Sequence, residues 1–278
     1  MQVSPRYDGP TIITISGDPL DQLAPVIRQR RRLQGALADL VPAQWSAASR
    51  CAGWTIKDVV SHLAGVNQFW TASIEAGLSG DATRWLSGFD PVATPEAMVA
   101  STRKLDAHEV FQRFADSNDR LLTTLEGLSI DQWSLPAEAP PGHLPIRLVA
   151  SHALWDSWIH ERDVFVPLEM TLDEIDDEVG SSLRYVAALS AAFGVMTGHF
   201  ESGQFAMVAT APDVACVIEV SDHVEMRDAT APSVVPTLRG DAVELLEALS
   251  FRSPLPADAP EGWRKLMNGL ANVFNTEI

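Results

Sequence analysis

The stretch from residue 148 to residue 164 reads LVASHALWDSWIHERDV and carries the side chains with the clearest capacity for chemistry. His152, Asp156 and His160 follow one another at intervals of four residues, which is about one helical turn. All three side chains would therefore project from one face of a helix. Because an imidazole and a carboxylate at i and i+4 can bind the same divalent ion, this spacing indicates a metal site.

Geometry limits which of these residues can share an ion. His152 and His160 are eight residues apart, about 12 Å along a helix, whereas a divalent metal lies about 2.1 Å from each ligand. Asp156 would therefore pair with either His152 or His160, and a third ligand would come from another element. The alternative interpretation is a hydrogen-bonded polar face that is buried in a helical bundle and binds no metal.

The composition is that of a globular protein large enough for two ordinary domains. The chain has 278 residues, of which 46% are hydrophobic and 21% are charged. No apolar run approaches the length of about 20 residues that spans a bilayer. Arg6, Asp8 and Pro10 interrupt any secretory signal at the N-terminus. We therefore expect a cytoplasmic protein that is not associated with a membrane.

The charge and the cysteine content narrow the possible partners. A formal net charge of -17 disfavours DNA and RNA, whose binding depends on phosphate contacts with Lys and Arg. The one basic run, residues 28–32 (RQRRR), is interpreted as the solvated face of a helix. The two cysteines, Cys51 and Cys216, are expected to be reduced, and Cys51 to be a small packed residue rather than a catalyst.

Apolar spacing and capping residues predict a helical first part of the chain. Thr55 and Asp58 match a capping box at the start of a helix that contains His62. A long helical pattern is broken near residues 105–108, where Asp106 would cap a new helix. Together with the stretch that carries His152, these helices predict an up-and-down four-helix bundle. Further helices are expected over residues 18–40, 95–128 and 172–197.

The pattern changes after Gly198, where alternating apolar residues predict strands instead of helices. The expected strands are residues 205–210, 214–220 and 233–238, followed by a helix over residues 241–249. The fold class is therefore α+β. We expect an N-terminal arm (1–17) with a short strand at residues 11–15, a metal-binding helical bundle (18–198), and a small α/β C-terminal domain (199–278) packed on the bundle.

Two motifs give the chain a resemblance to a known family. GWTIKDVVSHLAG at residues 53–65 and WDSWIHERDV at residues 155–164 resemble the mycothiol-dependent maleylpyruvate isomerase family, whose N-terminal part is a DinB-like metal-binding four-helix bundle. The resemblance covers most of residues 20–168. It implies that His62, Asp156 and His160 bind a divalent metal, usually zinc. Asp156 stands where the family usually has glutamate, which moves the ligand oxygen back by about one methylene.

The C-terminal part resembles the same family more weakly. LRGDAVELLEALSFRSP at residues 238–254 is similar to the terminal helix and closing Gly-Arg pair of its sterol-carrier-like domain, with Phe251 in place of the glycine. The resemblance implies that Arg252 holds an acidic substrate, and Arg239 is the second choice. The alternative is a surface arginine at a helix C-terminus. If Arg252 does hold substrate, the two domains share one active site.

The resemblance implies an enzyme in which the metal activates the thiol of mycothiol. The thiol would isomerise, or be transferred to, a small electrophilic and acidic substrate, in a monomer or a homodimer. Two other function classes remain open from the residues. One is a thiol-independent metal enzyme, a hydrolase or lyase of a biosynthetic pathway, and the other is a non-catalytic protein that binds a small molecule.

Overall fold

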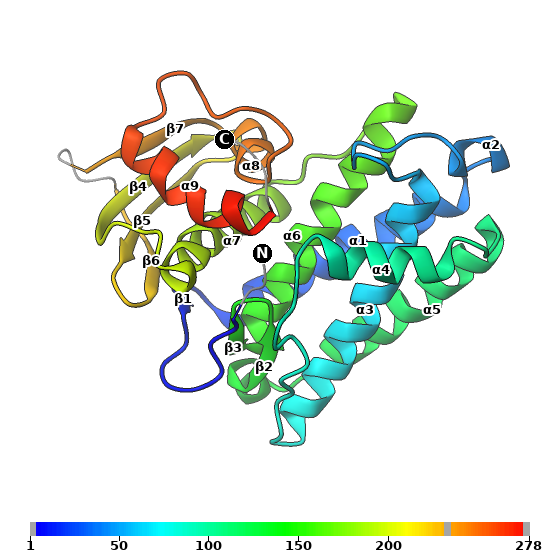
Figure 1. The fold of residues 1–278 in the computed structure, drawn as a ribbon, viewed down its shortest axis with the longest axis horizontal. Coiled ribbons are helices and arrows are strands. Elements are labelled where there is room, and N and C mark those ends of the chain that lie inside the picture. The colour runs from blue at the N-terminus through cyan, green and yellow to red at the C-terminus, as the bar shows by residue number, and fades with distance from the viewer. Residues whose placement is uncertain (1–3, 231–234, 275–278) are drawn as a thin grey trace.

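The computed structural model describes residues 4–230 and 235–274 and contains a helical bundle followed by a sheet (Figure 1). Four long helices contact one another in the first part of the chain, and the expected bundle is confirmed. The short α2 and α4 lie beside them. The helices of this part are α1 (Leu23–Ala38), α2 (Pro42–Trp45), α3 (Ile56–Leu78), α4 (Ala93–Thr102), α5 (Ala107–Glu126) and α6 (Ile146–Phe165).

Reciprocal capping fixes where two of the bundle helices begin. At the start of α3, the Asp58 N–H donates to the Thr55 hydroxyl, and the Thr55 N–H donates to the Asp58 carboxylate. Asp106 and Glu109 form the same pair of bonds at the start of α5. The expected capping box and the expected break before α5 are therefore both present, and they set the direction in which α3 presents His62.

The basic run at residues 28–32 is not the solvated face that the sequence pattern suggested. Only Arg31 is largely exposed, and it pairs with Glu126. Arg30 is fully buried, and Arg32 lies between Glu161 and Glu178 at 2.9 Å and 2.7 Å. The run is therefore mostly structural, because α1 packs against α5, α6 and α7 and leaves only part of its surface to solvent.

A fifth helix, α7 (Asp176–Thr197), lies between the bundle and the sheet. It begins four residues later than expected, because Ile175 is extended and caps the helix, and Gly198 at a φ of 72° ends it. By length and composition α7 could cross a membrane, but 72% of its most apolar window is buried in the protein. Its apolarity is accounted for by packing against α6, α8 and α9.

The second part of the chain is built on a five-stranded mixed sheet in the order β1-β6-β5-β4-β7. The strands expected at residues 205–210 and 214–220 are present. Residues 233 and 234 of the third expected strand lie outside the described residues, and β7 occupies the positions that follow. The elements of this part are β4 (Gly203–Thr210), β5 (Val214–Val220), β6 (Val224–Asp228), β7 (Thr237–Asp241), α8 (Ala242–Leu249) and α9 (Glu261–Phe274).

The N-terminal arm contributes to this same sheet. β1 (Ile13–Ile15) pairs in parallel with β6, so that Ile13 lies opposite Val224. The hairpin of β2 (Pro136–Ala139) and β3 (Gly142–Pro145) precedes α6 and packs against α3. One continuous apolar core runs from α3 and α6 through α7 into the sheet. The division of the chain at residue 198 remains a prediction.

The crossing of α7 and α9 depends on Gly269. A Cβ at Gly269 would lie 2.2 Å from the backbone nitrogen of Gly194, which is closer than atoms can approach. Gly269→Ala should therefore lower the free energy of unfolding by about 2–3 kcal/mol, as overpacking does. Gly35→Ala in α1 is the control, because nothing lies within 4 Å there and alanine favours helix by up to about 1 kcal/mol. Denaturant unfolding measures both, and a neutral Gly269→Ala would contradict the close crossing.

Candidate metal centre and its cavity

Three expected ligands converge at the centre of the bundle. His62 comes from α3, and Asp156 and His160 lie one turn apart on α6. Their ligand atoms all lie within 4.8 Å of one another. The Nε2 atoms of His62 and His160 lie 3.8 Å and 3.7 Å from Oδ1 of Asp156. The structure thus brings together the three residues that the family resemblance implied.

His152, the other candidate for pairing with Asp156, is engaged elsewhere. Its Nδ1 lies 2.8 Å from the hydroxyl of Tyr185, and its ring packs against Trp70 and Trp155. Burial lowers the pKa of His152 to about 4, so the ring is neutral at pH 7. His160, not His152, is the histidine of α6 that shares the cluster with Asp156.

The distances within the cluster fit a bound metal better than direct hydrogen bonds. Separations of 3.7 Å and 3.8 Å are too long for hydrogen bonds. Ligand atoms around a tetrahedral ion with bonds of about 2.1 Å are separated by about 3.4 Å. Nδ1 of His62 and Oδ2 of Asp156 are also buried without a hydrogen-bond partner among the described residues. The donor set therefore fits a divalent ion.

A carboxylate behind His160 sets the orientation of its ring. Nδ1 of His160 donates to Oδ2 of Asp163 at 2.9 Å, which leaves Nε2 free to face Asp156. Metal-binding histidines commonly donate their second ring nitrogen to a carboxylate in this way. Asp163 is fully buried and is itself held by Arg252, whose Nε and Nη2 lie 2.8 Å and 2.7 Å from its two oxygens.

Opposite charges keep both carboxylates ionised. Burial acts to raise the pKa of Asp156, but His62 and His160 hold it well below its usual range. Burial opposes ionisation of Asp163 in the same way, and Arg252 and His160 hold its pKa low. Burial also acts against a charged His160, yet its pKa is raised by Cys51, Asp163 and Asp156. The cluster therefore combines ionised carboxylates with imidazoles.

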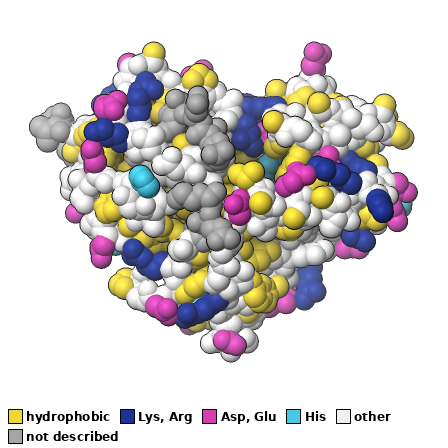
Figure 2. Space-filling view, in the orientation of Figure 1, with side chains coloured by type: hydrophobic (Ala, Val, Ile, Leu, Met, Phe, Trp, Pro, Cys, Tyr) yellow, Lys and Arg dark blue, Asp and Glu magenta, His cyan; other side chains and the backbone are white. Residues whose placement is uncertain are grey.

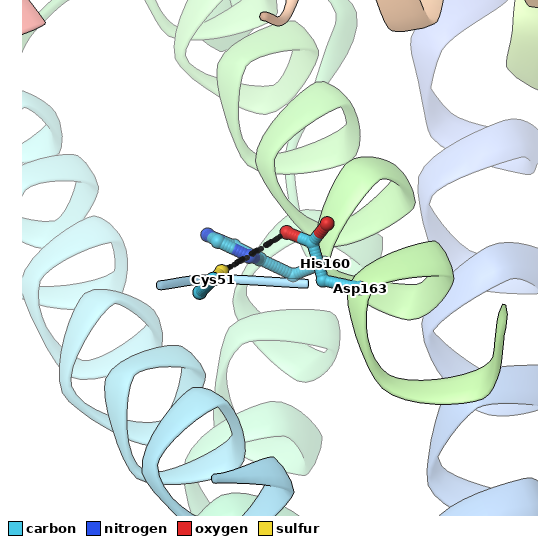
Figure 3. A group of neighbouring side chains, drawn as sticks. All are labelled: Cys51, His160 and Asp163. Atoms are coloured by element: carbon cyan, nitrogen blue, oxygen red, sulfur yellow. Dashed lines mark hydrogen bonds and ion pairs between the residues drawn. The ribbon is translucent and has the colours of Figure 1, made fainter. Parts of the chain in front are cut away.

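Cys51 lies in this cluster, which the sequence analysis did not expect. Its Sγ donates to Oδ2 of Asp163 at 3.2 Å and lies 3.7 Å from Nδ1 of His160 (Figure 3). It is half-buried and packs against a hydrophobic cluster of the bundle, as expected of a small packed residue, and it also lines the cavity. Cys51, His160 and Asp163 form a second group with metal-ligand residue types. Both oxygens of Asp163 already accept hydrogen bonds from Arg252, so the group with His62 and Asp156 fits an ion better.

Arg252 brings the C-terminal part of the chain to the metal centre. It follows α8, and its side chain lines the same cavity as the three candidate ligands. Nearby, Arg50 and Arg162 both pair with Glu247 of α8, at 2.6 Å and 2.5 Å, which ties α8 to the bundle. Arg239, the second choice for an anion-holding residue, is exposed on β7 and does not line the cavity.

The cavity has a volume of about 540 Å³ and is mainly apolar. Its deep wall is formed by α3, α6, α7 and α9, and its outer part by the segment before α4. On the face of the molecule that Figure 2 shows, basic and acidic side chains are interspersed among hydrophobic ones. The aromatic residues that line the cavity are Trp54, Phe69, Trp70, Trp85, Phe89, Trp155, Phe193, Phe251 and Phe274.

Sequence reasoning missed Asp163 and most of this lining. The signal for Asp163 was its position three residues after His160 on the same helix, where side chains meet. The aromatic lining had no comparable signal, since it comes from segments that are distant in the sequence. Leu270 and Phe274 lie on α9, a helix that the sequence analysis did not predict.

Comparison with known proteins identifies a matching family model and two solved structures with a similar fold. The model of the mycothiol maleylpyruvate isomerase N-terminal domain matches residues 26–165, which include all three candidate ligands but not Arg252. Crystal structures of a mycothiol-dependent maleylpyruvate isomerase and of a mutant of it are 16% and 15% identical to this chain. Both align with a TM-score of 0.60 over 84% of this chain and 90% of theirs. No curated protein matches the chain.

Proposed function

Because the chain belongs to the family of the mycothiol maleylpyruvate isomerase N-terminal domain, we propose that it is a metal-dependent enzyme that uses the thiol of mycothiol. Its substrate is a small electrophile. The observation that supports this most directly is the convergence of His62, Asp156 and His160 beside a cavity. We expect the reaction to take place in the cytoplasm, in a monomer or homodimer.

His62, Asp156 and His160 would hold the ion, with zinc as the expected metal. A site with three protein ligands keeps one position for an exogenous group, which is typical of catalytic zinc. When bound, the metal lowers the pKa of a thiol enough to generate the thiolate near neutral pH. The apolar lining excludes water from the reacting sulfur.

The reaction that the family suggests is isomerisation of a cis double bond. The thiol sulfur forms a bond to one alkene carbon, and the electron pair moves to the conjugated carbonyl. Rotation about the resulting single bond is followed by cleavage of the C–S bond, which returns the thiolate. The thiol is not consumed. If the adduct is instead protonated and released, the same site performs S-transfer.

Arg252 acts on this site first of all through Asp163. Its two hydrogen bonds fix the Asp163 carboxylate, which in turn fixes the ring of His160. In our proposal Arg252 is thus a positioning residue for a metal ligand. Direct contact with an acidic substrate, which the family resemblance implied for Arg252, remains a prediction.

Elemental analysis followed by an assay of thiol dependence tests the proposal. We expect stoichiometric zinc in the purified protein and mycothiol-dependent isomerisation of maleylpyruvate or a related electrophile. Removal of the metal with a chelator should lower turnover by at least about 100-fold, and added zinc should restore it.

The other function classes predict different results. Activity that requires the metal but no thiol would identify a hydrolase or lyase. A protein that purifies without stoichiometric metal and takes up none would be a small-molecule binder, and the proposal would be wrong.

A further inference from the structure

The cavity beside the candidate metal ligands is suited to an aromatic molecule. Its deep wall includes Trp70, Trp155, Phe193 and Leu270, all of which are at most 7% exposed. Trp85 at the outer part is 61% exposed and contacts the ring of Phe69 edge-on at 6.3 Å. Rings held in this way present both edges and faces to a planar ligand.

The side chains that line the cavity could pair with few negatively charged groups of a ligand. Among the described residues that line the cavity, Arg252 is the one Lys or Arg side chain. Its five N–H groups are largely used, since Nε and Nη2 bond to Asp163, Nη2 also approaches Cys51, and Nη1 donates to the carbonyl of Ser250. One hydrogen of Nη1 is left, which can serve a single carboxylate oxygen.

The backbone conformation of Phe251, the residue before Arg252, also favours an aromatic ligand. Phe251 has a φ of 58°, in the left-handed region that glycine adopts freely and other residues rarely adopt. At this position the family resemblance expects glycine. In this chain the residue is a phenylalanine in a strained backbone conformation. Its aromatic ring lies on the cavity wall, 6.5 Å from the ring of Phe274.

We propose that the electrophile of this site is a largely apolar molecule that carries an aromatic ring and at most one carboxylate, not a small dicarboxylate. This inference rests on the proposed function and specifies its substrate class. Once the thiolate fills the open position of the ion, one engaged arginine remains for the carboxylates of a substrate, so burying two of them would leave at least one charge unpaired, which is costly. A ring, in contrast, would be stabilised by the apolar walls.

Binding is tested with two unreactive keto acids on the zinc-loaded protein saturated with mycothiol, so that the thiol occupies the open position of the ion. 3-Benzoylpropanoate and 4-oxoheptanedioate share a ketone and a carboxylate, but the first has a phenyl ring where the second has another carboxyethyl arm. Neither has a double bond that Cys51 could attack. In calorimetric titrations we expect 3-benzoylpropanoate to bind at least about tenfold more tightly.

A pair of glycine variants tests whether the wall at Phe251 is responsible. Phe251→Gly relieves the left-handed strain and removes the ring, so it should weaken 3-benzoylpropanoate about tenfold and leave 4-oxoheptanedioate unchanged. Glu169→Gly is the matched control. Glu169 also has a positive φ, of 55°, but it is exposed and does not line the cavity. This variant should bind both keto acids like the parent protein.

Turnover separates this inference from the function on which it rests. With mycothiol present, (Z)-3-benzoylacrylate should be isomerised with a higher kcat/KM than maleylpyruvate. If the aromatic acid binds more tightly but no thiol-dependent turnover occurs, the cavity has the proposed selectivity and the proposed function fails. If 4-oxoheptanedioate binds as tightly as 3-benzoylpropanoate, or if neither binds, the inference about the substrate is wrong.

Discussion

Replacing His160 by alanine should reduce the zinc content from stoichiometric to nearly none, and thiol-dependent turnover should disappear with the metal. The reason is that His160 is one of three side chains that converge on the proposed ion. Loss of a partner that merely orients a ligand already lowers metal affinity 10–100-fold, so loss of the ligand should cost more than about 100-fold. Elemental analysis after dialysis measures the effect.

His152→Ala is the matched control for this variant. Both histidines lie on α6 and are buried, but His152 bonds to Tyr185 and lies outside the ligand cluster. It should therefore keep its zinc, and both variants should keep the helical circular dichroism of the parent. Full zinc occupancy in His160→Ala, with loss of zinc in His152→Ala, would reverse our assignment of the ligands on α6.

Replacing Arg30 by methionine should lower the free energy of unfolding by about 3 kcal/mol. Arg30 is fully buried and donates to Oδ1 of Asn67 at 2.5 Å, to Oδ1 of Asn118 at 3.3 Å and to the carbonyl of Ala153 at 2.8 Å. Methionine has a similar length but leaves these three acceptors without their donor. Each unpaired buried group costs about 1–3 kcal/mol, partly offset because a buried charge is removed.

The neighbouring arginine provides the control for this measurement. Arg31→Ala on the same helix removes an exposed ion pair with Glu126, which should change stability by at most about 1 kcal/mol. Chemical denaturation of both variants at one pH gives the comparison. A neutral or stabilising Arg30→Met would show that the acceptors find other partners, and that the buried arginine is not needed for the packing of α1.

The position of Arg30 illustrates what the sequence could predict about the fold. Val26, Arg30, Leu33 and Leu37 follow the 3.6-residue period, so the apolar pattern already placed Arg30 on the buried face. Because the neighbouring residues are also charged, the run at residues 28–32 was interpreted as a solvated face instead. Capping residues such as Thr55 and Asp106 were more informative, because a cap depends on local bonds that short sequence patterns encode.

One of the missed strands has a partner that is distant in the sequence. The strand Val224–Asp228 has a short alternating pattern, and it pairs both with β5, which directly precedes it, and with β1 near the start of the chain. In the site, the i and i+4 spacing identified Asp156 together with either His152 or His160, and the family resemblance selected His160 and added His62. Cys51 and Phe251 could not be placed in this way, since each reaches the cavity from a loop whose path is set by tertiary packing.

The parallel pairing of β1 with β6 also has a consequence for synthesis of the chain. Ile13 leaves the ribosome more than two hundred residues before its partner Val224. At a synthesis rate of about 5–20 residues per second, the arm remains unpaired for roughly 10–40 seconds before β6 has been synthesised. During that time its β-branched residues are an unpaired edge available to other nascent chains. A strand of three residues, Ile13–Ile15, keeps that edge short.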